Sequence, residues 1–168
     1  MERYTLGILV NNNPGVLSRI VGLFSRRGYN IDSLSVGETE NPKISRITIV
    51  VTGDRPIVTQ IQKQVAKLID VITVIELTMQ ASIQYELVLV KVNTDATNRA
   101  AVVELSEIFK AKIVDVSEKT LSMRITGNTD KITSFLHLLQ PYGIAELSRT
   151  GTTAIERGSQ AMINHKEE

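Results

Sequence analysis

The sequence has no cysteine, few aromatic residues and almost no net charge. Without cysteine there can be no disulfide framework, no thiolate nucleophile and no Cys-ligated zinc site. Nineteen Lys and Arg face eighteen Asp and Glu, so the net charge of +1 gives no field that would attract a polyanion. No apolar run approaches the roughly 20 residues of a membrane span, and the first run is too short for a signal peptide. We therefore expect a soluble, unprocessed, cytoplasmic protein that does not enter a membrane.

The first half of the chain alternates between strand and helix patterns. Residues 4–10 have the period of a strand, and Asn13 and Pro14 then offer a side-chain N-cap and a preformed first turn for a helix over 14–27. Extended segments follow at 30–36 and 47–51, then a second helix with Pro56 in its first turn, then the strand VITVIEL. The order is βαββαβ.

The same order recurs in the second half of the chain. Strands are predicted at 86–92, 112–117, 121–126 and 143–148, and helices at 96–110 and 130–140. Each predicted helix carries one apolar stripe, formed by Val102, Leu105 and Phe109 and by Ile132, Phe135, Leu136 and Leu139. The fold class is therefore α+β, with two tandem ferredoxin-like βαββαβ domains over 1–79 and 80–168. The tail after 148 has no sustained period, and we expect it to be partly loose.

Two functional classes find little support in the residues. A large class of RNA-binding domains has the βαββαβ order and stacks bases on aromatic side chains of its central strands, but here only Tyr4 lies near such a position. We expect no nucleic-acid partner. The two histidines, His137 and His165, lie in no catalytic or metal-ligand spacing. We therefore predict no catalytic residues, no metal site and no cofactor in this chain.

The segment NNNPG, residues 11–15, and the extended segment 30–36 are the candidate binding region. Right-handed crossovers give the strand order 4-1-3-2, which leaves 30–36 at a sheet edge as a possible seam between two chains. A helix N-terminus offers N–H donors to a carboxylate or phosphate, but the segment has no Lys or Arg and no P-loop glycine spacing. A carboxylate with its own ammonium fits better than a phosphate. A simple cap and turn would also explain this sequence.

The run LVNNNPGVLSRIVGLFSRRGYNIDSLSVG resembles the amino-terminal ACT domain of the small, regulatory subunit of acetolactate synthase (acetohydroxyacid synthase). The similarity continues through ISRITIVVTGD, KQVAKLIDVITVIEL, LVLVKV, IFKAKIVDVS and PYGIAELSRTGTTAIERG. ACT domains in general share only the loop and helix start. The RRGYNI segment and the RTG and RG endings are more specific to this subunit.

This resemblance implies a non-catalytic protein of branched-chain amino acid biosynthesis. Its partner would be the large, catalytic subunit, which would carry thiamine diphosphate, Mg²⁺ and FAD; the small subunit would activate it and confer feedback inhibition by valine. Valine would lie between the ACT domains of a homodimer joined through their edge strands. It would be held by Asn12, Gly15, Val16 and Leu17 of one chain and by Asn30 and Ile31 of the other.

Two points stay open at the level of sequence. A free-standing, amino-acid-sensing ACT protein that acts on another partner is the alternative function. The choice among valine, leucine and isoleucine also stays open, because one methylene changes binding by only about 1 to 3 kcal/mol.

Overall fold

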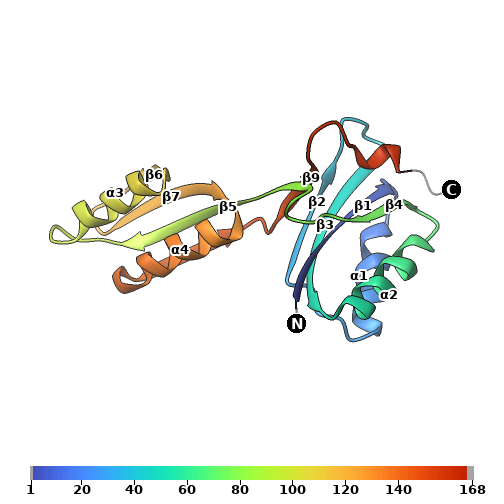
Figure 1. The fold of residues 1–168 in the computed structure, drawn as a ribbon. Helices are drawn as coiled ribbons and strands as arrows, with labels where there is room; N and C mark the ends of the chain where they lie inside the picture. The colour runs from blue at the N-terminus through green and yellow to red at the C-terminus, as the bar shows by residue number, and fades with distance from the viewer. Residues whose placement is uncertain (1, 166–168) are drawn as a thin grey trace. The chain divides into compact units, whose positions relative to one another are not determined.

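A computed structural model of the chain describes residues 2–165 and divides into two compact units (Figure 1). The first unit contains the chain up to Gln84 together with the tail from Thr152, and the second unit is Tyr85–Gly151. Within residues 2–165, none of the helices has both the length and the apolar character that crossing a membrane requires.

The first unit is a four-stranded antiparallel sheet with two helices on one face (Figure 1). Its elements are β1 (Glu2–Asn11), α1 (Val16–Arg26), β2 (Ser33–Glu38), β3 (Ile44–Gly53), α2 (Arg55–Ala66) and β4 (Val71–Glu76). The strand order β2-β3-β1-β4 is the predicted one, and β2 is an edge strand. The predicted α+β class and ferredoxin-like order are confirmed for this unit.

The core of the first unit follows from the strand alternation. Leu6 and Ile8 of β1 are fully buried under the apolar stripe of α1, to which Ile20 and Phe24 belong. Burying side chains of this size contributes about 1.5 to 3 kcal/mol each, so the helices are held mainly by this face. Position 7 of β1 points to the opposite face of the sheet.

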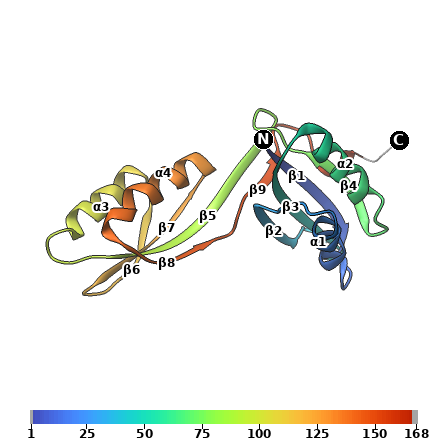
Figure 2. The same cartoon turned by 90° about the horizontal axis from the view of Figure 1, so that it is seen from below.

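The second unit repeats the arrangement with its own core (Figure 2). Its elements are β5 (Ser82–Asn93), whose first three residues belong to the first unit, α3 (Arg99–Ile108), β6 (Lys112–Val116), β7 (Thr120–Gly127), α4 (Thr129–Leu139), a 3₁₀ turn η1 (Gln140–Tyr142) and β8 (Ile144–Arg149). The strand order is β6-β7-β5-β8. Both predicted helix stripes face this core, with Val102, Ile132, Phe135 and Leu139 fully buried.

The start of α1 differs from the prediction. Gly15 is the N-cap residue, and the Asn13 side chain makes no cap hydrogen bond, so the helix begins at Val16. The Asn13 amide instead donates to Asp70, a residue 57 positions away. The acceptor that orients the Asn13 amide is distant in sequence, so the local pattern does not reveal it.

The tail after 148, which we expected to be partly loose, contains regular structure among the residues that the structure describes; residues 166–168 lie outside them. The tail forms strand β9 (Thr153–Glu156), which pairs with β5, and a 3₁₀ turn η2 (Met162–Asn164). Ala154 and Met162 are buried. Two buried apolar residues and backbone hydrogen bonds hold this segment, so the sequence shows no periodic apolar pattern from which its structure could be predicted. The tail, which the sequence analysis assigned to the second domain, packs in the first unit.

Candidate functional site

The Asn-rich loop, residues 11–15, connects β1 to α1 and is held from two sides. On one side the Asn11 N–H donates to the Asp70 carbonyl at 2.8 Å, in the turn before β4. On the other side the Asn12 N–H donates to the Lys43 carbonyl at 2.8 Å, in the turn between β2 and β3. The loop is therefore tied to both neighbouring connections of the sheet.

The Asn12 side chain extends the second of these ties. Its Nδ2 donates to Glu38 Oε1 at 3.0 Å and to the Pro42 carbonyl at 2.9 Å. Glu38 is the last residue of β2. The hydrogen bond from Asn12 to Glu38 thus places the Asn-rich loop at the carboxyl end of the edge strand β2.

Gly15 sets the geometry of the helix start. Its φ of 82° is in the left-handed region, which a glycine adopts without the steric cost that a Cβ brings. Among residues 2–165, neither the Leu17 nor the Ser18 backbone N–H has an acceptor. Two aligned donors at the positive end of the helix dipole are thereby left for an anion.

Val16 and Leu17, the next two predicted site residues, have different environments. Val16 is buried in the core of the first unit, so only its backbone can contribute to binding. Leu17 is 36% exposed and presents an apolar side chain beside the free N–H groups. The first four predicted residues therefore form one group around the start of α1.

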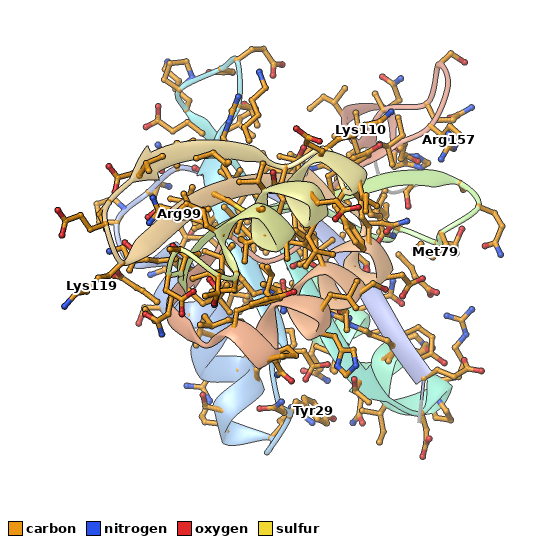
Figure 3. The ribbon with its side chains drawn as sticks, turned by 90° about the vertical axis from the view of Figure 1, so that its left-hand side faces the viewer. Tyr29, Met79, Arg99, Lys110, Lys119 and Arg157 are labelled. Atoms are coloured by element: carbon orange, nitrogen blue, oxygen red, sulfur yellow. The ribbon has the colours of Figure 1, made fainter. Side chains whose placement is uncertain are left out.

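Asn30 and Ile31 form a second group at the amino end of β2. Asn30 is exposed and donates from Nδ2 to Asp32 Oδ1 at 2.9 Å, while Asp32 Oδ2 accepts from Thr52 Oγ1 at 2.6 Å. Ile31 is half-buried against the core. Just before them Tyr29, labelled in Figure 3, packs edge-on against Phe24 with ring centroids 6.5 Å apart and so fixes the end of α1.

The two groups do not meet within one chain. They lie at opposite ends of α1, whose eleven residues span about 16 Å. They also lie at opposite ends of β2, because Asn12 contacts Glu38 whereas Asn30 and Ile31 precede Ser33. A single small amino acid cannot touch both groups of one chain.

Three side chains form a polar cluster behind the loop that the sequence analysis missed. Asp70 is 8% exposed; its Oδ1 accepts from Asn13 Nδ2 at 2.9 Å, and its Oδ2 pairs with Arg19 Nη2. The hydrogen bond from Asn13, and after it the hydrogen bond and charge of Arg19, lower the pKa of the Asp70 carboxyl, although burial acts in the opposite direction. Only the separation of these residues in sequence hid the cluster, since each is an ordinary polar residue in its own segment.

The two histidines lie in different surroundings. His137 is exposed on α4, and His165 Nε2 lies 2.8 Å from Glu156 Oε1 in the tail. The part of the chain described by the structure also contains no group of three or more His, Asp or Glu side chains that could hold a metal ion.

The arrangement around residues 11–17 suits binding of a small anion-bearing molecule.

Two family models match the chain. The model described as "AHAS small subunit-like ACT domain" matches residues 6–73, and the model "Small subunit of acetolactate synthase" matches residues 85–158. Together they cover both units.

Curated relatives match over nearly the full length. A probable acetolactate synthase small subunit of Archaeoglobus fulgidus is 48% identical over 94% of this chain and 99% of its own length. The acetolactate synthase small subunit of Mycolicibacterium smegmatis is 45% identical over 95% of this chain and 94% of its own length. Among solved structures, the acetolactate synthase small subunit from Thermotoga maritima aligns with a TM-score of 0.88 at 37% identity, covering 95% of this chain and all of that one. The chain belongs to the family of acetolactate synthase small subunits, with an ACT domain as its first unit.

Proposed function

We propose that this chain is the regulatory subunit of acetolactate synthase, which activates the catalytic large subunit and makes it sensitive to valine. The family membership supports the partner, and the groups around α1 support the effector. The thiamine diphosphate, Mg²⁺ and FAD of the reaction would belong to the large subunit.

The observation that carries the valine proposal is the position of the two residue groups at opposite ends of β2. If β2 pairs antiparallel with β2 of a second copy about a two-fold axis, the start of one strand lies beside the end of the other. Asn30 and Ile31 of the second copy then lie beside the Asn-rich loop, which Asn12 fixes at Glu38. The pairing joins the two groups that one chain keeps apart, and it creates two equivalent sites.

Valine fits the chemistry of such a composite site. Its carboxylate would accept from the free Leu17 and Ser18 N–H groups at the start of α1. Its ammonium would meet amide and carbonyl oxygens of Asn12 and Asn30, and its isopropyl group would contact Leu17 and Ile31. The cation beside the helix start, Arg19, is paired with the Asp70 carboxylate. Neutral Asn amides therefore suit a zwitterion better than a phosphate, which would need additional cationic partners.

A subunit-mixing experiment tests the composite site. Gly15→Asp damages only the loop group and Asn30→Ala only the β2-entry group, and each homodimer would lose or weaken both of its sites. In a mixed dimer one site carries both changes and the other carries neither. Free exchange of equal amounts of the two variants makes half of the dimers mixed, and each mixed dimer has one intact site. Calorimetric titration with valine should therefore show about a quarter of the wild-type stoichiometry at wild-type affinity after exchange.

The function itself is tested with the catalytic subunit. Acetolactate formation should rise when the chain is added and fall when valine is then added. Wild-type chain that binds valine but neither co-purifies with the large subunit nor changes its rate would contradict the proposal and favour an amino-acid sensor with another partner.

A further inference from the structure

We propose that Asp70 is a positioning residue for the effector: from the turn between α2 and β4 its carboxylate fixes the Asn-rich loop through Asn13 and Arg19. This inference rests on the proposed function, because it assigns Asp70 a role in the same effector site. Asp70 itself would touch no part of the effector.

The contacts of Asp70 bracket the loop. Its carbonyl accepts from Asn11, which begins the loop, and its carboxylate accepts from Asn13 in the middle and from Arg19 in the first helical turns. The pairing of β1 with β4 runs through Val10 and Val71, so Asp70 lies where the regular ladder ends. Beyond the last β1–β4 residue pair, Asp70 forms the hydrogen bonds that connect this edge of the sheet to the loop before α1.

Arg19 connects Asp70 to the helix start at Gly15. A Cβ built on Gly15 would lie 3.6 Å from Arg19 Nη1, while Nη2 of the same guanidinium is paired with Asp70. The Arg19 side chain is 54% exposed, so packing alone does not hold it. The carboxylate of Asp70 is what places the guanidinium beside the helix start.

The burial of Asp70 makes it costly to separate its carboxylate from Asn13 and Arg19. Its side chain is only 11% exposed, and a buried charge that loses its partners is costly. Displacing the loop would remove Asn13 and Arg19 from Asp70 together. The loop is therefore held in one arrangement before the effector arrives, which lowers the ordering cost of binding.

Asp70→Asn is the discriminating variant, because it keeps the volume but replaces one acceptor oxygen with an NH₂ donor facing Arg19. Glu76→Gln is the matched control. Glu76 lies at the other end of β4 and pairs with Arg55 of α2, so the control also removes an arginine–carboxylate pair but touches no loop residue.

Two measurements on the full chain decide the proposal. In titrations with valine, Asp70→Asn should raise the dissociation constant at least about tenfold, as expected for loss of charge-assisted hydrogen bonds, and Glu76→Gln should leave it unchanged. Combining Asp70→Asn with Arg19→Gln should weaken valine binding little further, because both changes remove the same Asp70–Arg19 interaction. Additive losses, or a dissociation constant of Asp70→Asn within twofold of wild type, would overturn the proposal.

Hydrogen exchange of the ligand-free chain separates this inference from the proposed function. The hydrogen-bonded amides of the loop, those of Asn11, Asn12, Asn13 and Val16, should exchange faster in Asp70→Asn and at the wild-type rate in Glu76→Gln. Equal exchange in both variants would overturn the positioning role. A wild-type chain that binds no valine would contradict the proposed effector, yet the exchange result would still decide whether Asp70 orders the loop. If Asp70→Asn fails to fold, the double variant Asn13→Ala with Arg19→Gln replaces it. This variant removes the same hydrogen bonds by changing the two partners of Asp70, and the same limits on the dissociation constant and on amide exchange apply to it.

Discussion

Gly7 of β1 and Met162 of the tail are in contact on the face of the first sheet opposite its helices: a Cβ built on Gly7 would lie 2.9 Å from Met162 Sδ. The neighbours Leu6 and Ile8 point into the core, so Gly7 faces the other way. The absence of a side chain at position 7 makes room for the methionine. Met162 of the tail and Leu77 thereby cover position 7 on this face of the sheet.

Met162→Ala should destabilise the first unit. Met162 is 3% exposed, and truncating a buried methionine to alanine costs about 2 to 5 kcal/mol through lost burial and the remaining cavity. Urea denaturation followed by circular dichroism measures the loss. Ile163→Ala is the neighbouring control, because Ile163 is 47% exposed and its truncation should change stability by less than about 0.5 kcal/mol. Equal losses in the two variants would show that Met162 does not anchor the tail.

Gly15→Asp should give a folded subunit that is insensitive to valine. The new side chain would lie in the effector space beside Arg19, at a φ of 82° that disfavours any Cβ. Gly158→Asp is the control, since Gly158 has a similar φ of 74° in the tail and its Cβ would contact nothing within 4 Å. Valine inhibition of the reconstituted enzyme should be lost in the first variant and kept in the second. Inhibition of Gly15→Asp at wild-type valine concentrations would remove Gly15 from the site.

Asn30→Ala should weaken valine binding by about 1 to 3 kcal/mol, the cost of losing a hydrogen-bond partner in a site that closes on its ligand. Calorimetric titration reports the change directly. Asn164→Ala in the tail serves as a control for removing an exposed asparagine. An unchanged dissociation constant for Asn30→Ala would leave only the Asn-rich loop as the binding group.

The sequence predicted features that depend on periodicity, and the structure confirms them. The helix stripes of the second unit follow from local apolar spacing. The strand order with β2 at the edge follows from the βαββαβ order and right-handed crossovers. The features that it did not predict depend on single contacts between distant residues. Asn13 binds Asp70 rather than capping α1, and Met162 is buried against a glycine near the amino terminus. No local pattern distinguishes such an asparagine from a capping one.

Arg149→Ala should destabilise the second unit. Arg149 begins the RTG segment and donates from Nε and Nη2 to Glu86 Oε2 at 3.1 and 2.6 Å, and Glu86 is 3% exposed. Removing the arginine leaves a buried carboxylate with Thr129 as its one described side-chain donor, which should cost about 3 kcal/mol. Lys91→Ala breaks the exposed Lys91–Glu146 pair of the same sheet and should have little effect. Comparable losses of melting temperature would mean that the Glu86 pair is no more important than a surface pair.

The start of α3 should make stability depend on acidic pH. Asp95 Oδ1 accepts from the Thr97 hydroxyl at 2.6 Å, from the Thr97 N–H at 2.8 Å and from the Asn98 N–H at 3.1 Å. The hydroxyl, and then the two N–H groups, hold the pKa of Asp95 below its ordinary value of 3.8. A carboxyl with a lowered pKa in the folded state stabilises the fold above its unfolded-state pKa, and this stabilisation disappears as the pH falls through the folded-state value.

Asp95→Asn should therefore melt at a lower temperature than wild type near neutral pH, and the difference should narrow as the pH falls below about 3.8. Melting curves of both proteins between neutral and strongly acidic pH provide the measurement. Asp115→Asn is the control, because Asp115 lies on the exposed strand β6 and no described residue donates to its carboxylate. A constant difference between wild type and Asp95→Asn across this range would show that the charge of Asp95 does not contribute to the stability of the turn before α3.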